Sequence, residues 1–279
     1  MNIVCCIKQV PDTAQVKIDP DTNTLIRSGV ESICNPYDLV AVEMAVRLAE
    51  RYSGKVTVIS MGPPQTESAL RECLALGADK AILLSDRAFA GADTLATSYT
   101  LAQAISRIAT DETVDLVVCG KQAIDGDTAQ TGPGTATRLG YHQFTYVSEV
   151  IGVDLEKNTI TVRREVENGS EIIEGTLPAL LTVELEAASP GYASLPELVR
   201  SLIQEVPTWG ADDIKGSPES LGLKGSPTWV KEIFAPPART GGLLFDSAEN
   251  KDQAIADFLD VFFEKEHEIL DELWSVDKG

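Results

Sequence analysis

The feature that most constrains the fold is an alternation of short apolar runs with helical patterns over the first two-thirds of the chain. Four runs have the length and composition of buried parallel strands: 2–8, 55–60, 81–85 and 114–119. Between the last two, Leu101, Ala104 and Ile108 share one face of a helix expected from about 93 to 109. Strands that alternate with helices form βαβ units with right-handed crossovers. We therefore predict a doubly wound, mostly parallel α/β sheet, which binds ligands beyond the carboxyl ends of its strands.

After about residue 140 the pattern changes to one typical of antiparallel strands. Apolar and polar residues alternate in three runs that short turns separate: 144–150, 158–166 and 172–175. We therefore expect an antiparallel addition over about residues 144–175. The apolar run 177–183 then predicts one more buried strand, which rejoins the main sheet.

Beyond Pro190 the chain loses the alternation of strands and helices. Prolines interrupt a long segment, and a last helix is expected from roughly 251 to 274. A segment this long without its own core favours an extended arm that packs on something else. We predict an α/β domain over 1–190 and a C-terminal arm over 191–279 that packs on a partner subunit. Packing on the domain's own surface is the alternative.

The loop from Gly120 to Thr131 is the strongest candidate for a binding element. It follows an apolar strand and leads into a helix expected from about 127 to 139. Such a helix start presents unpaired N–H groups and a positive dipole end, where phosphates bind. Asp125 and Asp127 would repel a phosphate, so we expect them to cap the helix or to accept hydrogen bonds from a ribose or a base. An ordinary capped loop is the alternative.

A second loop, around Asp93, faces the same end of the predicted sheet. Asp93 is the expected N-cap of the helix that follows, and Thr94 and Thr97 offer hydroxyl groups. The free N–H groups of that first helical turn could hold a pyrophosphate. A capped helix start without any ligand explains Asp93 equally well. Together, the two loops predict that the α/β domain over 1–190 binds a nucleotide.

Composition excludes several classes of partner. The chain has 23 basic and 43 acidic residues and a formal net charge of −20, so it would repel nucleic acid and anionic membranes. No apolar run approaches the roughly 20 residues needed to span a bilayer, so we expect no membrane insertion. The five cysteines form no CxxC pair and lie mostly in apolar segments, which favours reduced core thiols. The chain enters a strand at its second residue, which leaves no room for a leader peptide, and we expect a cytoplasmic protein.

Catalytic and metal-binding motifs are poorly represented. The two histidines, His142 and His267, are expected at the surface. GxSxG, HExxH and Walker A motifs do not occur, so we predict no catalytic residues and no metal site. Such a nucleotide site suits an electron carrier better than a hydrolase. Whether the chain is itself an enzyme stays open.

Several motifs together resemble the β subunit of electron transfer flavoproteins. They include 1–11, Asn35-Pro36, Met61-Gly-Pro, Leu-Gly-Ala-Asp at 76–79, Gly-Lys-Gln-Ala-Ile-Asp at 120–125, Tyr-Ala-Ser-Leu-Pro at 192–196 and Pro-Pro-Ala-Arg-Thr at 236–240. The resemblance implies a Rossmann-like fold of the adenine-nucleotide α-hydrolase type. It also implies a heterodimer with an α subunit that holds a flavin, and a β-subunit crevice that binds either AMP or a second FAD.

The resemblance also assigns nucleotide contacts to individual residues. They are Cys6, Asn35, Asp38, Met61, Gly120, Lys121, Gln122, Ala123, Ile124, Asp125, Gly126, Asp127, Thr128, Ala129, Gln130 and Thr131. The second loop adds three further candidate contacts: Asp93, Thr94 and Thr97.

Three segments, 124–133, 86–94 and 221–228, are similar to the electron-bifurcating members of this family. That similarity implies that FAD takes a hydride from NADH. One electron would then go through the α-subunit FAD to a flavin dehydrogenase, and the other to ferredoxin or flavodoxin. Tyr192, Leu195 and Pro196 resemble the loop that docks the dehydrogenase. Members often have arginine where this chain has Gly191, so the dehydrogenase could be of the acyl-CoA type, the lactate type or another.

Two other functions remain open from the sequence. One is a non-bifurcating electron transfer flavoprotein β subunit with a structural AMP, which would contain one FAD plus AMP rather than two FAD. The other is an ATP-binding module of the same fold, which would bind ATP tightly or turn it over. The missing basic phosphate cluster counts against this last function.

Overall fold

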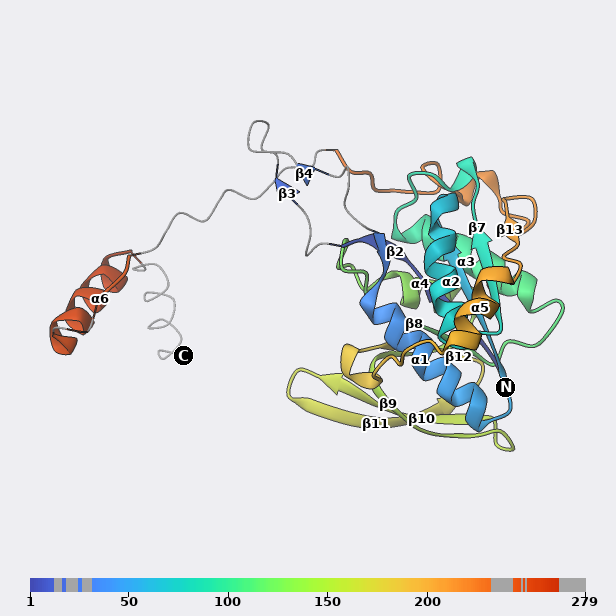
Figure 1. Cartoon of the computed structure of the whole chain (residues 1–279), viewed down its shortest axis with the longest axis horizontal. Helices are drawn as coiled ribbons and strands as arrows, with labels where there is room; N and C mark the ends of the chain where they lie inside the picture. Colours follow the sequence, from blue (N-terminus) through green and yellow to red (C-terminus); the bar gives the residue numbers. More distant parts are fainter. Residues whose placement is uncertain are drawn as a thin grey trace, which may run out of the picture. The chain divides into compact units, whose positions relative to one another are not determined.

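The computed structural model describes residues 1–12, 17–18, 25–26, 32–231, 243–246, 248 and 250–265 (Figure 1). The chain divides into two compact units, Met1–Ile233 and Phe234–Gly279. We expected the α/β domain to end near residue 190, and the first unit continues past that point to Ile233. In the second unit the structure describes the helix α6 (Lys251–Lys265), inside the predicted range. Residues 266–274 of that prediction lie outside the described residues.

A nine-stranded sheet runs through the described part of the first unit, in the order β11-β10-β9-β12-β8-β1-β6-β7-β13. Six consecutive strands, from the centre of the sheet to its β13 edge, pair in parallel with one another. They are β1 (Asn2–Ile7), β6 (Lys55–Met61), β7 (Lys80–Leu84), β8 (Leu116–Gly120), β12 (Ala179–Val183) and β13 (Thr208–Trp209). The mostly parallel α/β fold predicted from the alternating patterns is confirmed.

The antiparallel addition extends this sheet rather than forming a separate one. β10 (Thr159–Val166) pairs antiparallel with both β9 (His142–Asp154) and β11 (Gly169–Thr176). β9 also pairs in parallel with β12, so the run predicted at 177–183 does rejoin the main sheet. Short antiparallel pairs join β2 (Gln9–Pro11) to β5 (Ser32–Cys34) and β3 (Lys17–Ile18) to β4 (Leu25–Ile26).

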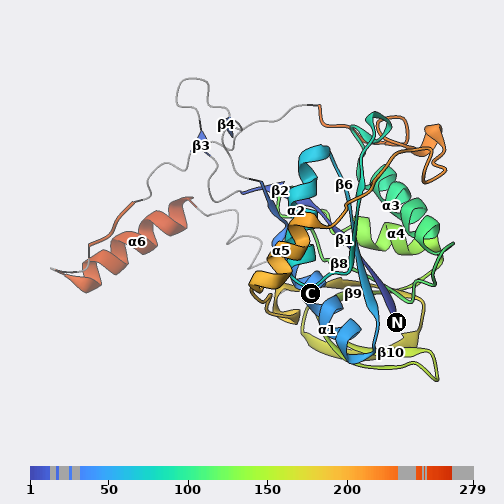
Figure 2. The ribbon, with the colours of Figure 1, turned by 45° about the vertical axis from the view of Figure 1, so that its right-hand side comes forward.

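Helices cover both faces of the sheet. α1 (Pro36–Arg51) and α2 (Glu67–Ala75) pack on one face, and α3 (Thr94–Ile108) and α4 (Thr131–Leu139) pack on the other (Figure 2). Successive side chains of a strand point to opposite faces, and in β1 this sends Ile3 and Cys5 into one core and Val4 and Cys6 into the other. Short 3₁₀ turns complete this unit at Pro64–Thr66, Arg87–Phe89, Leu185–Ala187 and Pro218–Ser220.

The order of the strands reverses next to β1. The chain passes through α1 to β6 and through α2 to β7 on one side of β1, and it then returns through α3 to β8 on the other side. In doubly wound sheets such a reversal opens a crevice beyond the carboxyl ends of the strands. The fold therefore places a candidate site next to the ends of β1 and β8.

Three elements differ from the prediction. α4 begins at Thr131 rather than near residue 127. Within the segment expected to be extended, Leu195–Ile203 forms helix α5 and Thr208–Trp209 adds β13 to the sheet edge beside β7. Pro196 lies in the first turn of α5, where proline costs no helical hydrogen bond, so the proline did not mark a break. Among the described residues, no helix is long and apolar enough to cross a membrane.

Candidate nucleotide-binding site

A cavity of about 570 Å³ lies at the reversal of strand order. Its walls are the ends of β1 and β8, the loop 121–130 between β8 and α4 (the β8–α4 loop), the first turns of α3 and α4, and residues 228 and 230. Of the residues predicted to contact a nucleotide, all but Ile124 and Asp125 line it. They are Cys6, Asn35, Asp38, Met61, Asp93, Thr94, Thr97, Gly120, Lys121, Gln122, Ala123, Gly126, Asp127, Thr128, Ala129, Gln130 and Thr131.

Asp38, in the first turn of α1, ties the ends of two strands together at the base of this cavity. Its carboxylate oxygens accept hydrogen bonds from the backbone N–H groups of Lys8 and Gly120, at 2.8 and 2.9 Å. Burial raises the pKa of Asp38 to about 7, although these hydrogen bonds oppose the shift. Asp38 therefore fixes the spacing between the strand ends that form the cavity.

Asn35 holds the β8–α4 loop in place. Its side-chain amide donates to the carbonyl oxygen of Gln122 at 2.8 Å, and its side-chain oxygen accepts from the N–H group of Ile124 at 3.2 Å. Ile124 is thus engaged by Asn35 and does not line the cavity. In this structure Asn35 shapes the loop whose remaining residues form the cavity wall.

We expected Asp125 and Asp127 to cap α4 or to accept hydrogen bonds from a ligand, and neither one caps the helix. Asp125 pairs with the ammonium of Lys8 at 2.7 Å, and Asp127 accepts from the side-chain amide of Gln122 at 2.9 Å. Asp127 has a φ of 49°, outside the helical region, so the chain makes a tight turn before α4 begins. The two carboxylates are therefore engaged by Lys8 and Gln122 rather than by the first N–H groups of α4.

The N-terminus of α4 has no side-chain cap. Gln130, the N-cap residue, makes no capping hydrogen bond, and Gln130, Thr131 and Gly132 all line the cavity. The first N–H groups of a helix have no partner within the helix and form the positive end of its dipole. This end of α4 therefore offers backbone donors and a favourable field to a phosphate.

The N-terminus of α3 is closed by the chain itself. Asp93 is its N-cap, as predicted, and one carboxylate oxygen accepts from the N–H groups of Leu95 and Ala96 at 2.9 and 3.0 Å. The other oxygen accepts from the hydroxyl of Thr228 at 2.8 Å and from its N–H group at 3.2 Å. Two of the N–H groups expected to hold a pyrophosphate at this helix, those of Leu95 and Ala96, are thus bonded to Asp93.

Residues 222–230, here called the C-terminal strap, contribute two residues to the cavity wall, and none of them was predicted to contact a nucleotide. Thr228 and Val230 line the cavity, and the Ser226 hydroxyl accepts a hydrogen bond from the N–H group of Asp93 at 2.8 Å. The N–H group of Leu223 donates to the carbonyl oxygen of Ala90 at 3.1 Å. The resemblance to bifurcating members included residues 221–228. The contacts of this segment with residues 90 and 93 cannot be predicted from a local pattern, because more than 130 residues separate them.

Both lysines that line the cavity already have carboxylate partners. Lys8 pairs with Asp125, as described above. The Lys121 ammonium lies 2.9 Å from a carboxylate oxygen of Glu184, and this hydrogen bond raises the pKa of Lys121. It also lies 5.5 and 5.6 Å from the ring centres of Tyr37 and Tyr146. The positive end of α4 is therefore the main attraction that the cavity offers to an anion.

The cysteines contribute neutral walls rather than reactive groups. All five are free and buried, and Cys6 and Cys119 line the cavity. Burial raises the pKa of both thiols well above the usual value, so they stay protonated. Among the described residues, no group of three or more histidine, cysteine, aspartate or glutamate side chains is arranged to hold a metal. His142 is exposed on β9, and His267 lies outside the described residues.

The residues predicted to dock a partner lie elsewhere on the molecule. Tyr192, Leu195 and Pro196 are exposed, and none of them lines the cavity. Leu195 and Pro196 begin α5, which packs against α2. The structure thus separates the predicted nucleotide residues from the predicted docking residues.

Comparisons with known proteins agree with this geometry. The family described as "Electron transfer flavoprotein domain" matches residues 22–213. The electron transfer flavoprotein subunit beta of Clostridium acetobutylicum is 50% identical over 246 residues, which cover 88% of this chain and 92% of that protein. This chain belongs to the electron transfer flavoprotein family.

The subunit beta of Clostridium acetobutylicum also places this chain with the β subunits of the family, and two further relatives are equally similar. Protein FixA of Azotobacter vinelandii is 50% identical over 245 residues, 86% of each chain. Caffeyl-CoA reductase-Etf complex subunit CarD of Acetobacterium woodii is 50% identical over 243 residues, 87% of this chain and 90% of that protein. The resemblance noted from the motifs is confirmed, and with it a part in electron transfer.

Proposed function

We propose that this chain is the β subunit of an electron-bifurcating electron transfer flavoprotein, that its cavity binds FAD, and that NADH is the electron donor. One electron would pass through the α-subunit FAD to a flavin dehydrogenase, and the other to ferredoxin or flavodoxin. The observation that carries this proposal is the cavity at the strand-order reversal, with an uncapped helix N-terminus in its wall.

The donors around the cavity fit the pyrophosphate of an adenine dinucleotide. No side chain caps the first turn of α4, so its backbone N–H groups are among the donors open to a ligand. The first turn of α4 supplies these groups, and the hydroxyls of Thr128 and Thr131 lie in the same wall. The cavity volume of about 570 Å³ is within the range of cofactor sites.

The chain's own residues would bind the cofactor and exclude water from it. α4 would hold the pyrophosphate, while Asn35 and Asp38 keep the β8–α4 loop and the strand ends in register. Cys6, Met61 and Leu101 give the cavity apolar wall surface. When bound, FAD supplies the ability to accept a hydride from NADH and to release electrons one at a time.

The second unit supports an α-subunit partner. Along α6, large apolar side chains are 38–51% exposed within this chain: Ile255, Phe258, Leu259, Phe262 and Phe263. A contiguous apolar surface of this kind is typical of a protein interface. We propose that the C-terminal arm, originally predicted over 191–279, meets the α subunit through its second unit.

The docking residues Tyr192, Leu195 and Pro196, together with α5, are proposed to meet the flavin dehydrogenase. Leu195 and Ile203 are 74% and 82% exposed at the two ends of the helix. The name of the relative CarD refers to a caffeyl-CoA reductase complex, which supports an acyl-CoA type of dehydrogenase over a lactate type. The five free, buried cysteines suit a reducing compartment, and we propose the cytoplasm.

Gly126 provides a direct test of cavity occupancy. It lines the cavity, and a Cβ atom built on it meets no atom within 4 Å, so the chain itself has room for a larger side chain at this position. Gly126→Leu should reduce flavin content in the purified heterodimer while its secondary structure, followed by circular dichroism, is retained. Gly152→Leu is the matched control, because Gly152 is equally open but lies on β9 outside the cavity lining. Equal flavin content in the two variants would contradict the site.

Anaerobic titration with NADH tests the bifurcating chemistry. NADH should bleach flavin absorbance in the purified heterodimer without any dehydrogenase present. Reduction only by a dehydrogenase, with AMP bound in the cavity, would instead establish the non-bifurcating carrier. ATP turnover by this chain would favour the ATP-binding module.

A further inference from the structure

Helix α5 is attached to the body of the protein by polar contacts and turns apolar side chains outward. A surface helix ordinarily buries its apolar face. In α5 the buried residue is Ser201, whereas the exposed set consists of Leu195, Leu198, Val199, Leu202 and Ile203, at 45–82% exposure. With nine residues, such a helix has little stability of its own and needs external support.

Arg71 of α2 supports the C-terminus of α5. One of its terminal nitrogens donates to the carbonyl oxygen of Ser201 and, at 3.2 Å each, to those of Leu202 and Gln204. The Nε atom of Arg71 donates to Glu67, one turn earlier on α2, at 2.8 Å. The last carbonyl groups of a helix have no partner within it, so this arginine satisfies acceptors that α5 cannot satisfy itself.

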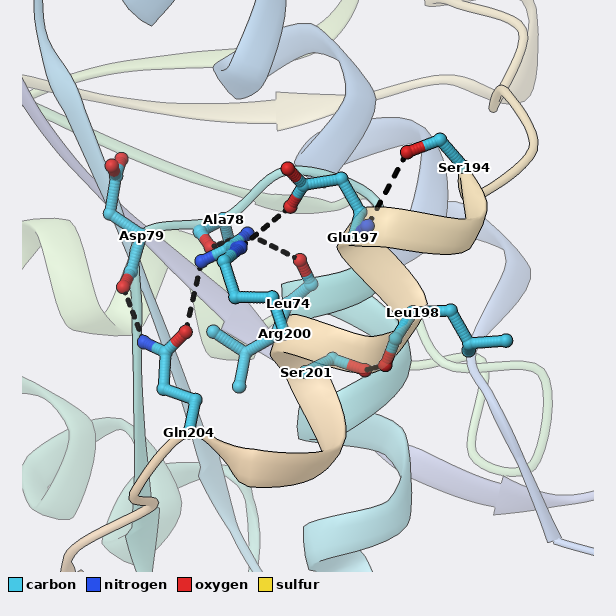
Figure 3. Close-up of polar contacts among 9 residues, drawn as sticks. All are labelled: Leu74, Ala78, Asp79, Ser194, Glu197, Leu198, Arg200, Ser201 and Gln204. Atoms are coloured by element: carbon cyan, nitrogen blue, oxygen red, sulfur yellow. Dashed lines mark hydrogen bonds and ion pairs between the residues drawn. The ribbon is translucent and has the colours of Figure 1, made fainter.

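Arg200 of α5 in turn donates hydrogen bonds to carbonyl groups at the C-terminus of α2 (Figure 3). One terminal nitrogen donates to the carbonyl oxygens of Leu74 and Ala78, at 2.9 and 3.1 Å. The Nε atom donates to Glu197, one turn earlier on α5, at 2.6 Å, and the other terminal nitrogen donates to Gln204 at 2.9 Å. Each arginine is thus oriented by a glutamate of its own helix and caps the other helix, at the negative end of its dipole.

Further contacts fix the two ends of α5. The Ser194 hydroxyl accepts from the N–H group of Glu197 at the helix start, at 3.4 Å, and the Gln204 amide donates to the carbonyl oxygen of Asp79 at 2.6 Å (Figure 3). Asp79 itself accepts from the N–H group of Val56 in β6, at 2.8 Å. The helix is therefore connected to the central sheet by directional bonds.

We infer that Arg71 and Arg200 are positioning residues for docking of the flavin dehydrogenase. This inference rests on the proposed function, which assigns the exposed face of α5 to that partner. Each arginine bonds carbonyl groups at the C-terminus of the other helix. Together they hold α5 in one orientation with its apolar face exposed. A surface that is already ordered loses less conformational entropy on binding, so the dehydrogenase binds more tightly.

The test uses the heterodimer with its flavins and measures dehydrogenase-dependent electron transfer against dehydrogenase concentration. Arg71→Gln and Arg200→Gln should each raise the apparent KM for the dehydrogenase by about tenfold, the size expected from losing hydrogen bonds to a charged group. The rate at saturating dehydrogenase and the flavin content should be unchanged, and backbone hydrogen exchange in α5 should accelerate. Arg200→Lys should give a KM between those of the wild type and Arg200→Gln. The lysine keeps the positive charge, but its single ammonium reaches fewer carbonyl groups than the guanidinium does.

Two further variants separate this inference from the proposed function. Arg107→Gln removes an arginine of α3 that pairs with Asp111, on the opposite face of the sheet, and should leave the KM unchanged. Leu195→Asp places an acid in the first turn of α5, where the dipole favours it, and removes an exposed apolar side chain. If Leu195→Asp does not raise the KM, the docking proposal fails. If it does, and both arginine variants keep the wild-type KM, the positioning inference is overturned.

Discussion

The two helix N-termini that line the cavity are satisfied in different ways. At α3, Asp93 accepts from the first-turn N–H groups and also holds Thr228 of the C-terminal strap. At α4 no side chain caps the helix, and Asn35 and Asp38 act instead on the residues that precede it. The helix start of α3 thus has a side-chain cap within the chain, and that of α4 has none. We therefore expect a phosphate to bind at α4 rather than at α3.

The largest expected effect on stability concerns Asp38. Its carboxylate accepts a hydrogen bond from Gly120, directly before the loop that leads into α4. Burial raises the pKa of Asp38 from 3.8 to about 7, which corresponds to roughly 4 kcal/mol. The folded state therefore holds this proton more tightly than the unfolded state does. The stabilising contribution is complete below about pH 4 and is lost as the pH rises through about 7.

Asp38→Asn removes this titration. The free energy of unfolding of the wild type, measured relative to Asp38→Asn by urea denaturation, should fall by several kcal/mol between pH 4 and pH 8. A difference between the two proteins that is constant over this range would show that Asp38 does not titrate as its burial requires.

Gly132, in the first turn of α4, should show the next largest effect. A Cβ atom there would lie 2.5 Å from Cγ2 of Thr182 and 2.9 Å from the sulfur of Cys119. Gly132→Ala should therefore destabilise the fold by about 1–3 kcal/mol, because the packed core has no room for the methyl group. Gly126→Ala is the control and should change the free energy of unfolding by less than about 0.5 kcal/mol. Equal effects would contradict the close packing of α4 on the strand ends.

Asp93→Ala tests the closed helix N-terminus directly. Loss of the cap should cost about 1–2 kcal/mol of stability and make the C-terminal strap more sensitive to limited proteolysis. Asp93→Asn keeps an acceptor oxygen and should cost less. Nucleotide retention should not improve in Asp93→Ala. Tighter retention would mean that the phosphate prefers α3, which reverses the assignment made above.

Asp125→Ala should have the smallest effect on stability. Its ion pair with Lys8 is partly exposed on both sides, and such pairs contribute less than about 1 kcal/mol. The loss of this pair frees the end of the β8–α4 loop, so the variant should retain its nucleotide less well while its sheet stays folded. Equilibrium dialysis and circular dichroism measure the two quantities. Unchanged retention would remove Asp125 from any part in the site.

Local patterns predicted the parts of this molecule that local physics determines. The apolar runs 2–8 and 114–119 became central strands because both of their faces are buried. Asp93 was identified as an N-cap from its position alone, and it does cap α3. The cavity residues at 35, 38 and 120–131 came from motifs, and all but Ile124 and Asp125 line the cavity.

The remaining features depend on contacts between distant parts of the chain. Thr228 reaches Asp93 across 135 residues, and Arg200 reaches Leu74 across 126, so no sequence window contains either pair. α5 was missed because its apolar side chains face outward and a proline occupies its first turn. Asp127 was expected to cap α4 because an aspartate before a helical pattern usually does so. The positive φ that places it in a tight turn instead cannot be recognised from the residue type alone.

The most direct test of the central claim is to identify the nucleotides released when the purified heterodimer is denatured. We predict two FAD per heterodimer, one of them from the cavity between the strand ends and α4. We further predict that Gly126→Leu lowers the yield to one FAD. One FAD together with AMP, or no adenine nucleotide attributable to this chain, would contradict the central claim.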